Sequence, residues 1–488
     1  MILVFAFQDK MYRFDSKIYR FQKKYLTISK IRNTIYGISG RLQERNATST
    51  THRGAVSEIF FGIEALRSTF VTQNMTKVGL FGIGLEAYWP QFDGLLPRLE
   101  GYQRVIAKQL QRDGVEIVDA GMIDTPEKAY AAGDRFKQED VALIFLYVST
   151  YALSSTVLPV VQKAKVPVIV LNLQPERAID YATFNALGDR TKMTGEWLAH
   201  CQACSVPEIA SAFNRSQIRF HQVTGTLYDD EEAWNEIGEW IEAARVRRIV
   251  ERNRVGLLGH YYNGMLDIYS DPTQHSAFFG CHMEHVEMTE VKHFREITTE
   301  AEIEAKVAQI YDEFEVMSDC SPAEVRRAAH TACALDKLVE QHNLGSMAYY
   351  YVGEGDETYQ DIISSVIVGC SLLTGHNVPV AGEYEVKNAQ AMKIMDTFGV
   401  GGSFTEFYAM DFNEDIILMG HDGPGHIAIA EGKPKLKPLK VYHGKIGQGL
   451  SVEMNVKTGP VTLLSVIQSF DGKIRFLVAE AETVPGPI

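Results

Sequence analysis

Three ionisable residues in the last quarter of the chain, Glu383, Glu406 and His421, have the side-chain types of a metal site. Each lies beside glycines or at the edge of an apolar run, where a strand or helix ends and a side chain can enter a cleft. Two carboxylates and an imidazole suit a hard or borderline divalent ion such as Mn²⁺, and another divalent metal would also fit. Carboxylates on a metal can also move protons, so the three residues predict acid–base chemistry on a metal-held substrate.

Length and composition are those of an ordinary globular protein. The chain has 488 residues, of which 45% are hydrophobic and 23% are charged. This length is enough for roughly two to four domains, each with its own core. The net charge of −14 argues against nucleic acid as a partner, because nucleic-acid binding depends on basic patches. No apolar run approaches the roughly 18 residues that a membrane span needs, so we expect none.

The first 50 residues differ from the rest in charge. They contain ten Lys and Arg against three Asp and Glu, a net charge of +7, so the remainder carries −14 − 7 = −21. The apolar run 1–7 precedes the basic residues and lacks a small-residue cleavage site, which is not typical of a signal peptide. We therefore predict a basic, poorly ordered extension over residues 1–75, with a surface-binding arm as the alternative.

Six cysteines in a chain of this length do not indicate a disulfide framework. Cys201 and Cys204 form a C-x-x-C pair, but neither a second pair nor a suitably spaced histidine completes a zinc site. The surrounding sequence is typical of a helix, so we expect two structural cysteines there. A reducing, cytoplasmic location follows from this pattern.

Apolar runs of strand length alternate with amphipathic patterns of helix length in the first two thirds of the chain. The first set, residues 76–175, has expected strands at 77–84, 115–118, 141–148 and 166–172 and expected helices at 95–111 and 125–139. Such alternation predicts a parallel sheet covered on both faces, and hence an N-terminal α/β domain.

A second α/β domain is expected over residues 176–380. A long helical pattern at 229–252 leads to a strand at 254–260, and a helix-rich region follows at 299–342. Within this region, Ser321 followed by Pro322 predicts a helix start. The apolar stretch 361–370 favours a core helix, with a buried strand as the alternative.

Residues 381–488 are expected to form a C-terminal β-rich domain, which also carries the three candidate site residues. Short strand patterns at close spacing occur at 416–419, 439–442, 450–456, 461–466 and 474–478. Turn signals such as Thr458-Gly459 and Asp471-Gly472 separate them and favour antiparallel pairing. The predicted fold class is α/β, with two Rossmann-like parallel-sheet domains followed by this antiparallel module.

Three further motifs are weaker. Gly82-Ile-Gly84 follows a strand as in a dinucleotide site, but Pro90 interrupts the expected helix, so a dehydrogenase is only a third hypothesis. The cluster 281–287 contains two histidines and two glutamates and is most consistent with a mixed polar strand edge, with a contribution to an active-site wall as the alternative. The loop 260–273 is rich in polar and aromatic residues that suit a sugar.

The segments around the candidate site resemble the L-arabinose isomerase family and, more distantly, the L-fucose isomerases. The resemblance rests on G-E-Y-E-V-K-N-A-Q-A-M-K-I-M, G-G-S-F-T-E-F-Y and L-M-G-H, and it covers roughly residues 76–488. It implies that Glu383, Glu406 and His421 bind Mn²⁺ and that the two glutamates are catalytic. It also implies a three-domain subunit that forms homotrimers or homohexamers, with active sites at subunit interfaces.

The chain departs from the family pattern in two places. Family members supply a further ligand histidine near their C-terminus, and the last residues here, 484–488, contain none. His426 and His443 are the nearest candidates in sequence for that ligand. A family histidine that binds substrate is also absent, and Ser149 lies near its place.

The function that these patterns predict is metal-dependent aldose–ketose isomerisation of a small sugar through an ene-diol. One glutamate would remove the proton alpha to the carbonyl, and the other would move a proton between oxygens. The alternative is a noncatalytic sugar-binding protein, in which two α/β domains close on a sugar without converting it.

Overall fold

The structure, a computed structural model, describes residues 3–7, 75–353, 355–439 and 448–486. The chain divides into two compact units, and its first strand belongs to the unit formed by its second half. Unit 1 comprises Met1–Arg13 and Glu242–Ile488, and unit 2 comprises Phe14–Ile241. No described helix combines the length and apolar character that crossing a membrane requires.

Unit 2 is built on a five-stranded parallel sheet. The strand order is β3-β2-β4-β5-β6. The strands are β2 (Thr76–Ile83), β3 (Val115–Ile123), β4 (Leu143–Val148), β5 (Val168–Gln174) and β6 (Phe220–Thr226). All six residues of the central strand β4 are buried, as expected for a continuous apolar run covered on both faces.

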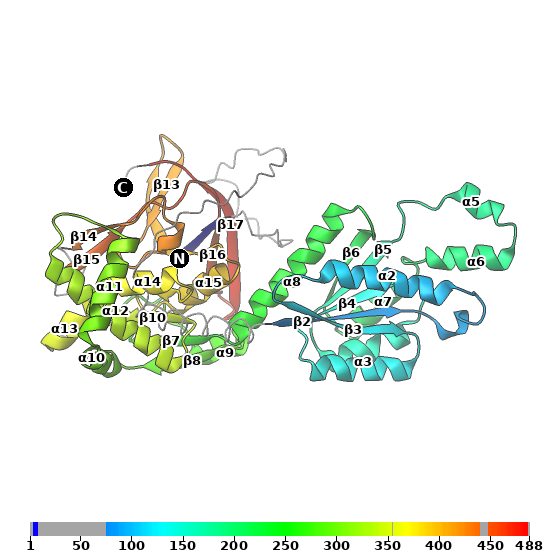
Figure 1. Ribbon diagram of the computed structural model, residues 1–488, viewed down its shortest axis with the longest axis horizontal. Helices are drawn as coiled ribbons and strands as arrows, with labels where there is room; N and C mark the ends of the chain where they lie inside the picture. The colour runs from blue at the N-terminus through cyan, green and yellow to red at the C-terminus, as the bar shows by residue number, and fades with distance from the viewer. Residues whose placement is uncertain (1–2, 8–74, 354, 440–447, 487–488) are drawn as a thin grey trace, which may run out of the picture. The chain divides into compact units, whose positions relative to one another are not determined.

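Helices lie on both faces of this sheet. The helices of unit 2 are α2 (Leu95–Leu110), α3 (Pro126–Gln138), α4 (Leu158–Ala164), α5 (Tyr181–Ala186), α6 (Arg190–Ala199) and α7 (Val206–Arg215), and α8 (Glu231–Glu251) follows them. Of these, α5 buries no residue. Figure 1 shows α2 and α3 on opposite faces. Local sequence sets where they begin: the Thr125 hydroxyl accepts a hydrogen bond from the amide of Lys128, and Pro126 occupies the first turn of α3.

Unit 1 contains a second parallel sheet, with strand order β11-β10-β7-β8. Its strands are β7 (Arg254–Gly259), β8 (His282–Val286), β10 (Ser346–Tyr350) and β11 (Val380–Ala381). Its helices are α9 (Pro272–Phe279), α10 (Met288–Ile297), α11 (Glu300–Glu313), α12 (Pro322–His342), α13 (Glu357–Ile363), α14 (Val366–Gly375) and α15 (Val386–Thr397). The predicted start at Ser321 is confirmed, because its hydroxyl accepts a hydrogen bond from the amide of Ala323.

Two further sheets lie in unit 1 (Figure 1). One is an antiparallel sheet of order β13-β12-β1-β16-β17, and the other is a three-stranded sheet of order β15-β14-β9. The strands are β1 (Leu3–Phe7), β12 (Ser403–Asp411), β13 (Ile416–Gly420), β16 (Gly459–Gln468) and β17 (Ile474–Thr483), with β9 (Glu315–Val316), β14 (Lys435–Leu439) and β15 (Gly449–Glu453). The predicted α/β class, with two parallel sheets and antiparallel strands near the C-terminus, is confirmed.

The helix favoured over 361–370 is confirmed, as α13 and α14 with a short turn between them. The structure differs from the sequence-based description in two respects. Strand β6 pairs with β5, so the first sheet extends past residue 175 and the two units divide within α8. Strand β1 lies inside the expected extension 1–75, whereas residues 8–74 lie outside the described residues.

Candidate active site

Glu383 lies in the tight turn between β11 and α15. Its φ is 58° and that of Tyr384 is 61°, so two consecutive residues with side chains adopt the left-handed conformation. The amide of Tyr384 donates to the carbonyl of Tyr349 at 2.9 Å, and the amide of Tyr262 donates to the carbonyl of Glu383 at 3.3 Å. Neighbouring backbone therefore imposes an unfavourable conformation on the turn, as is common where a side chain is held for function.

Glu406 and His421 reach the site from two paired strands. Glu406 of β12 is opposite Gly420 of β13 in the antiparallel register, so His421 follows directly after Glu406's partner. The imidazole packs edge-on against Phe404, with ring centroids 4.2 Å apart. A Cβ at Gly423 would lie 3.2 Å from Nδ1 of His421, so this glycine leaves room for the ring.

The carboxylate of Glu383 and the imidazole of His421 face each other without a hydrogen bond. Oε1 of Glu383 lies 3.9 Å from Nε2 of His421, and the side chains are 20% and 10% exposed. The other atom of each group, Oε2 of Glu383 and Nδ1 of His421, is buried without a hydrogen-bond partner among the described residues. Buried polar atoms are usually satisfied, so these atoms indicate a place for a ligand.

Glu406 belongs to the same electrostatic neighbourhood. Burial raises the pKa of Tyr408, and the charges of Glu406, Asp422 and Glu383 raise it further. Burial, Tyr262 and Glu383 likewise raise the pKa of Tyr350. Glu406 and Glu383 therefore lie within electrostatic range of one phenol, and Glu383 also lies beside His421.

Sequence reasoning missed the phenols and Asp422. Asp422 directly follows His421, and Tyr408 follows Glu406 by two positions, so their proximity to the predicted residues was the available signal. That signal is weak, because a bulge between Phe407 and Ala409 changes the strand register at Tyr408.

The donor set fits a divalent cation in chemistry, although its present geometry is not that of a closed site. Among the described residues, no group of three or more His, Cys, Asp or Glu side chains is arranged to hold a metal ion. The carboxylate of Glu383 and the imidazole of His421, each with a buried unsatisfied atom, and the carboxylate of Glu406 are nevertheless groups of the kind that bind Mn²⁺. Their chemistry fits such an ion.

His426 and His443 are the sequence candidates for a fourth ligand. His426 is buried, its Nε2 lies 3.6 Å from Oδ1 of Asp396, and its amide donates to the hydroxyl of Ser403. His443 lies outside the described residues. Ser149, near the place of the family's substrate-binding histidine, is in unit 2, where its hydroxyl donates to the carbonyl of Ile83 at 2.6 Å.

The glycines of the weak dinucleotide motif make room for protein side chains. A Cβ at Gly82 would lie 2.3 Å from the Gln103 side chain, and one at Gly84 would lie 2.7 Å from the Trp89 ring. The space that a pyrophosphate would need is thus filled from within the protein, which argues against the dehydrogenase hypothesis.

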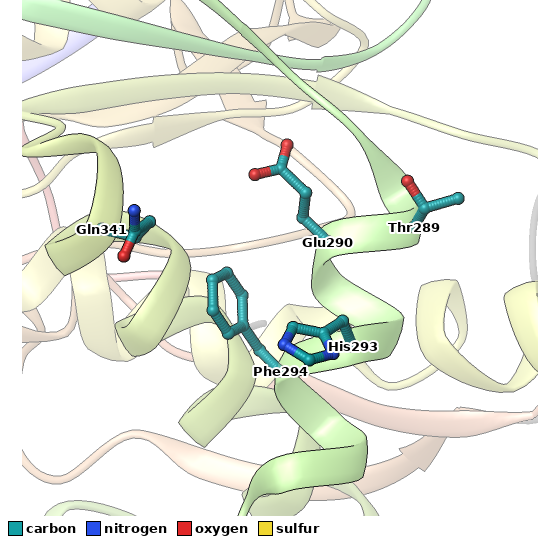
Figure 2. Close-up of a pocket in the computed structure, with 5 residues that line it drawn as sticks. All are labelled: Thr289, Glu290, His293, Phe294 and Gln341. Carbon is teal, nitrogen blue, oxygen red and sulfur yellow. The ribbon is translucent and has the colours of Figure 1, made fainter.

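A surface depression of about 430 Å³ lies elsewhere in unit 1, on α10 and the end of α12. Figure 2 shows its lining residues, Thr289, Glu290, His293, Phe294 and Gln341. None of the candidate site residues lines it. Nearby Glu284 on β8 is engaged in ion pairs with Arg254 and His282, which fits the polar strand edge expected for this cluster.

The C-x-x-C prediction was wrong in its local structure. Cys201 and Cys204 lie in the turn between α6 and α7 rather than within a helix, and a disulfide joins them. Cys201 is 2% exposed, whereas Cys204 is exposed. The described remaining cysteines, Cys281, Cys320, Cys333 and Cys370, are free and buried.

Comparison with known proteins does not place the chain in a family. No family model matches it, and no curated protein matches it. Among solved structures, an ABC transporter substrate-binding protein from Sphaerobacter thermophilus aligns with 83% of this chain and 98% of its own, at 12% identity and a TM-score of 0.16. A TM-score this low supports no argument about fold or function.

Proposed function

We propose that this protein is a metal-dependent aldose–ketose isomerase of the L-arabinose isomerase type, acting on a small sugar. The observation that carries the proposal is the convergence of Glu383 and His421, 3.9 Å apart, each with a buried atom that lacks a hydrogen bond. Glu406, opposite Gly420, adds a second carboxylate, so that one can move the proton between the carbons and the other the proton between the oxygens.

The chemistry follows from the roles that this chain's own side chains can take. A bound divalent ion would supply Lewis-acid polarisation of the sugar carbonyl. One of Glu383 and Glu406 removes the proton from the carbon alpha to that carbonyl and returns it to the neighbouring carbon, giving an ene-diol in between. The other carboxylate moves a proton between the two oxygens. Tyr408, whose raised pKa keeps the phenol protonated, can donate a hydrogen bond to a sugar oxygen.

The decisive experiment is a screen of aldoses with Mn²⁺ present, on the wild-type chain and on Glu406→Gln. We expect metal-dependent ketose formation by the wild type and none by the variant, because glutamine is similar in size but cannot accept a proton. Glu414→Gln, an exposed glutamate in the turn of the same hairpin, is the matched control and should keep full turnover. Near-normal turnover by Glu406→Gln would refute its role. Sugar binding by the wild type without conversion supports a noncatalytic sugar-binding protein instead.

Metal binding provides a second readout that does not depend on turnover. The signal of free aqueous Mn²⁺ in electron paramagnetic resonance falls when the ion binds protein. Wild type should reduce this signal, and His421→Ala and Glu383→Gln should reduce it much less. An equal reduction by the two variants and the wild type would contradict the assigned ligands.

We also propose that the chain forms homo-oligomers, with active sites near subunit interfaces. The β12–β13 hairpin carries Glu406 and exposes Met410, Phe412 and Leu418, which are 59%, 87% and 55% exposed. β13 is an edge strand of its sheet, and apolar surface on such an edge commonly marks an interaction site. Homotrimers or homohexamers are the assemblies that the family resemblance suggests.

We also propose that the protein is cytoplasmic, as its few cysteines indicate. Disulfides are rare in reducing compartments, and those that occur there are usually transient, catalytic or redox-sensing. In the cytoplasm, the disulfide between Cys201 and Cys204 would therefore be of this transient, catalytic or redox-sensing kind.

A further inference from the structure

The disulfide in unit 2 presents two unequal sulfur atoms. Cys201 is 2% exposed, and Cys204 is exposed. An external thiol can therefore reach Cys204, while Cys201 is shielded from it. This asymmetry is the arrangement in which an external thiolate attacks one sulfur and the other leaves.

The four-residue ring that the disulfide closes is attached to the segment after β4. Gln202, within the ring, is fully buried, and its Nε2 donates to the carbonyls of Ser149 at 3.0 Å and Ala199 at 2.8 Å. The hydroxyl of Ser205, directly after the ring, accepts from the amide of Ala152 at 2.7 Å and donates to its carbonyl at 2.9 Å.

A further hydrogen bond ties the end of α6 to the same segment. The hydroxyl of Thr150 donates to the carbonyl of Leu198 at 2.8 Å. Gln202 in the ring, Ser205 after it and Leu198 before it are thus hydrogen-bonded to residues within 149–152. This segment follows the carboxyl end of the central strand β4. This edge of an open parallel sheet is where such folds bind ligands.

We propose that Cys201–Cys204 is a thiol–disulfide exchange site whose redox state sets the mobility of residues 149–152. A dithiol reductant supplies the two electrons. Its first thiolate attacks Sγ of Cys204, the Cys201–Cys204 bond breaks, and Cys201 leaves as a thiolate that takes up a proton. The second thiol of the reductant then attacks the mixed disulfide, which releases Cys204 and an oxidised, disulfide-bonded reductant.

Local structure also favours the exposed cysteine as the more reactive thiol after reduction. Cys204 lies just before Ser205, the N-cap residue of the ten-residue helix α7. The Ser205 side chain makes no capping hydrogen bond there. The positive end of the helix dipole therefore stabilises a thiolate at Cys204.

The test uses the full chain purified without reductant and then equilibrated with mixtures of reduced and oxidised dithiothreitol. We expect two additional thiols to appear reversibly as the ratio becomes more reducing. In the reduced protein, maleimide should modify Cys204 about tenfold or more faster than Cys201, because exposure and thiolate character govern this rate. A thiol count independent of the ratio, or equal rates at the two cysteines, would overturn the exchange site.

Hydrogen–deuterium exchange on the same samples tests the coupling to the sheet. Reduction should speed exchange in peptides covering 149–152 and leave those covering β10 in unit 1 unchanged. Cys204→Ser should show the fast exchange with or without reductant, and Cys281→Ser, which alters a free buried cysteine, should behave as the wild type. An exchange rate at residues 149–152 that is the same in the oxidised and reduced protein would overturn the coupling. Neither readout depends on isomerase activity.

Discussion

Glu383 and His421 face each other at 3.9 Å from elements of different kinds, a left-handed turn and the end of a strand. The separation is too long for a hydrogen bond, so no direct hydrogen bond fixes the pair. The backbone aims both side chains instead, through the turn at Glu383 and the register of the β12–β13 hairpin. A ligand between them would therefore meet groups that are already oriented.

The left-handed turn predicts a difference in stability between two variants that both lose function. Glu383→Gly and Glu383→Ala both remove the carboxylate, but only glycine adopts a φ of 58° without steric cost. We expect Glu383→Gly to be more stable than Glu383→Ala by about 1 kcal/mol in urea unfolding. Both should lack turnover. Equal stability of the two variants would show that the turn is not strained.

Two glycines with the same backbone conformation separate steric conflict from backbone strain. Gly259 and Gly264 both have a φ of 91°, but a Cβ at Gly259 would lie 2.0 Å from the carbonyl oxygen of Tyr350, whereas nothing lies within 4 Å at Gly264. We expect Gly259→Ala to lower the free energy of unfolding by about 3 kcal/mol or more, against about 1 kcal/mol for Gly264→Ala. Chemical denaturation of the pair measures the difference, and similar losses would contradict the steric argument.

A buried histidine should make unit 1 sensitive to acid. Burial, and then the charge of Lys387, lower the pKa of His275 to about 4, from 6.5 in the unfolded chain. The unfolded chain thus binds a proton that the folded protein excludes, so stability present above pH 6.5 is lost as the pH falls toward 4. The loss between pH 7 and pH 5 should be about 2 kcal/mol.

The substitution that tests this linkage is His275→Asn, with unfolding measured at both pH values. The variant should lose less stability on acidification than the wild type, whatever its stability at pH 7. His285→Asn, at an exposed position, should keep the wild-type loss. An unchanged acid sensitivity in His275→Asn would assign the effect to other groups.

The exposed hairpin predicts how association can be broken. Leu418→Lys places a charge on the edge strand β13, where it opposes pairing with another copy. Light scattering should report a lower mass for this variant than for the wild type. Leu266→Lys, at a position that is 74% exposed in a loop, is the control and should keep the wild-type mass. An unchanged mass for Leu418→Lys would exclude this face from the interface.

The sequence predicted the sheets because buried parallel strands are continuous apolar runs. β4 and β7 were located in this way, and Ser321 marked a helix start through its hydroxyl. The candidate site residues could also be proposed from the sequence, because glycines such as Gly423 lie beside them and make room for their side chains. Apolar runs, helix N-caps and flanking glycines each depend on residues that are close in sequence, so they can be recognised without knowing the fold.

Features that depend on distant partners were not predicted. β1 has neighbours about 400 residues away, and no local pattern indicates such pairing. The turn at Cys201 was hidden because residues on both sides favour a helix. The unit boundary lies within α8 because β6 joins the first sheet. Most residues of β6 are exposed or half-buried, so its sequence lacks the continuous apolar run that marks a buried parallel strand.

The pairing of β1 also sets an order of events during synthesis. Leu3 pairs with Thr405, which is made 405 − 3 = 402 residues later. At about 5–20 residues per second, the first strand waits on the order of 20–80 s for that neighbour, and longer for β16. Unit 2 leaves the ribosome whole within that interval. The antiparallel sheet that carries Glu406 is therefore among the last parts of the protein to close, with its oldest strand at its centre.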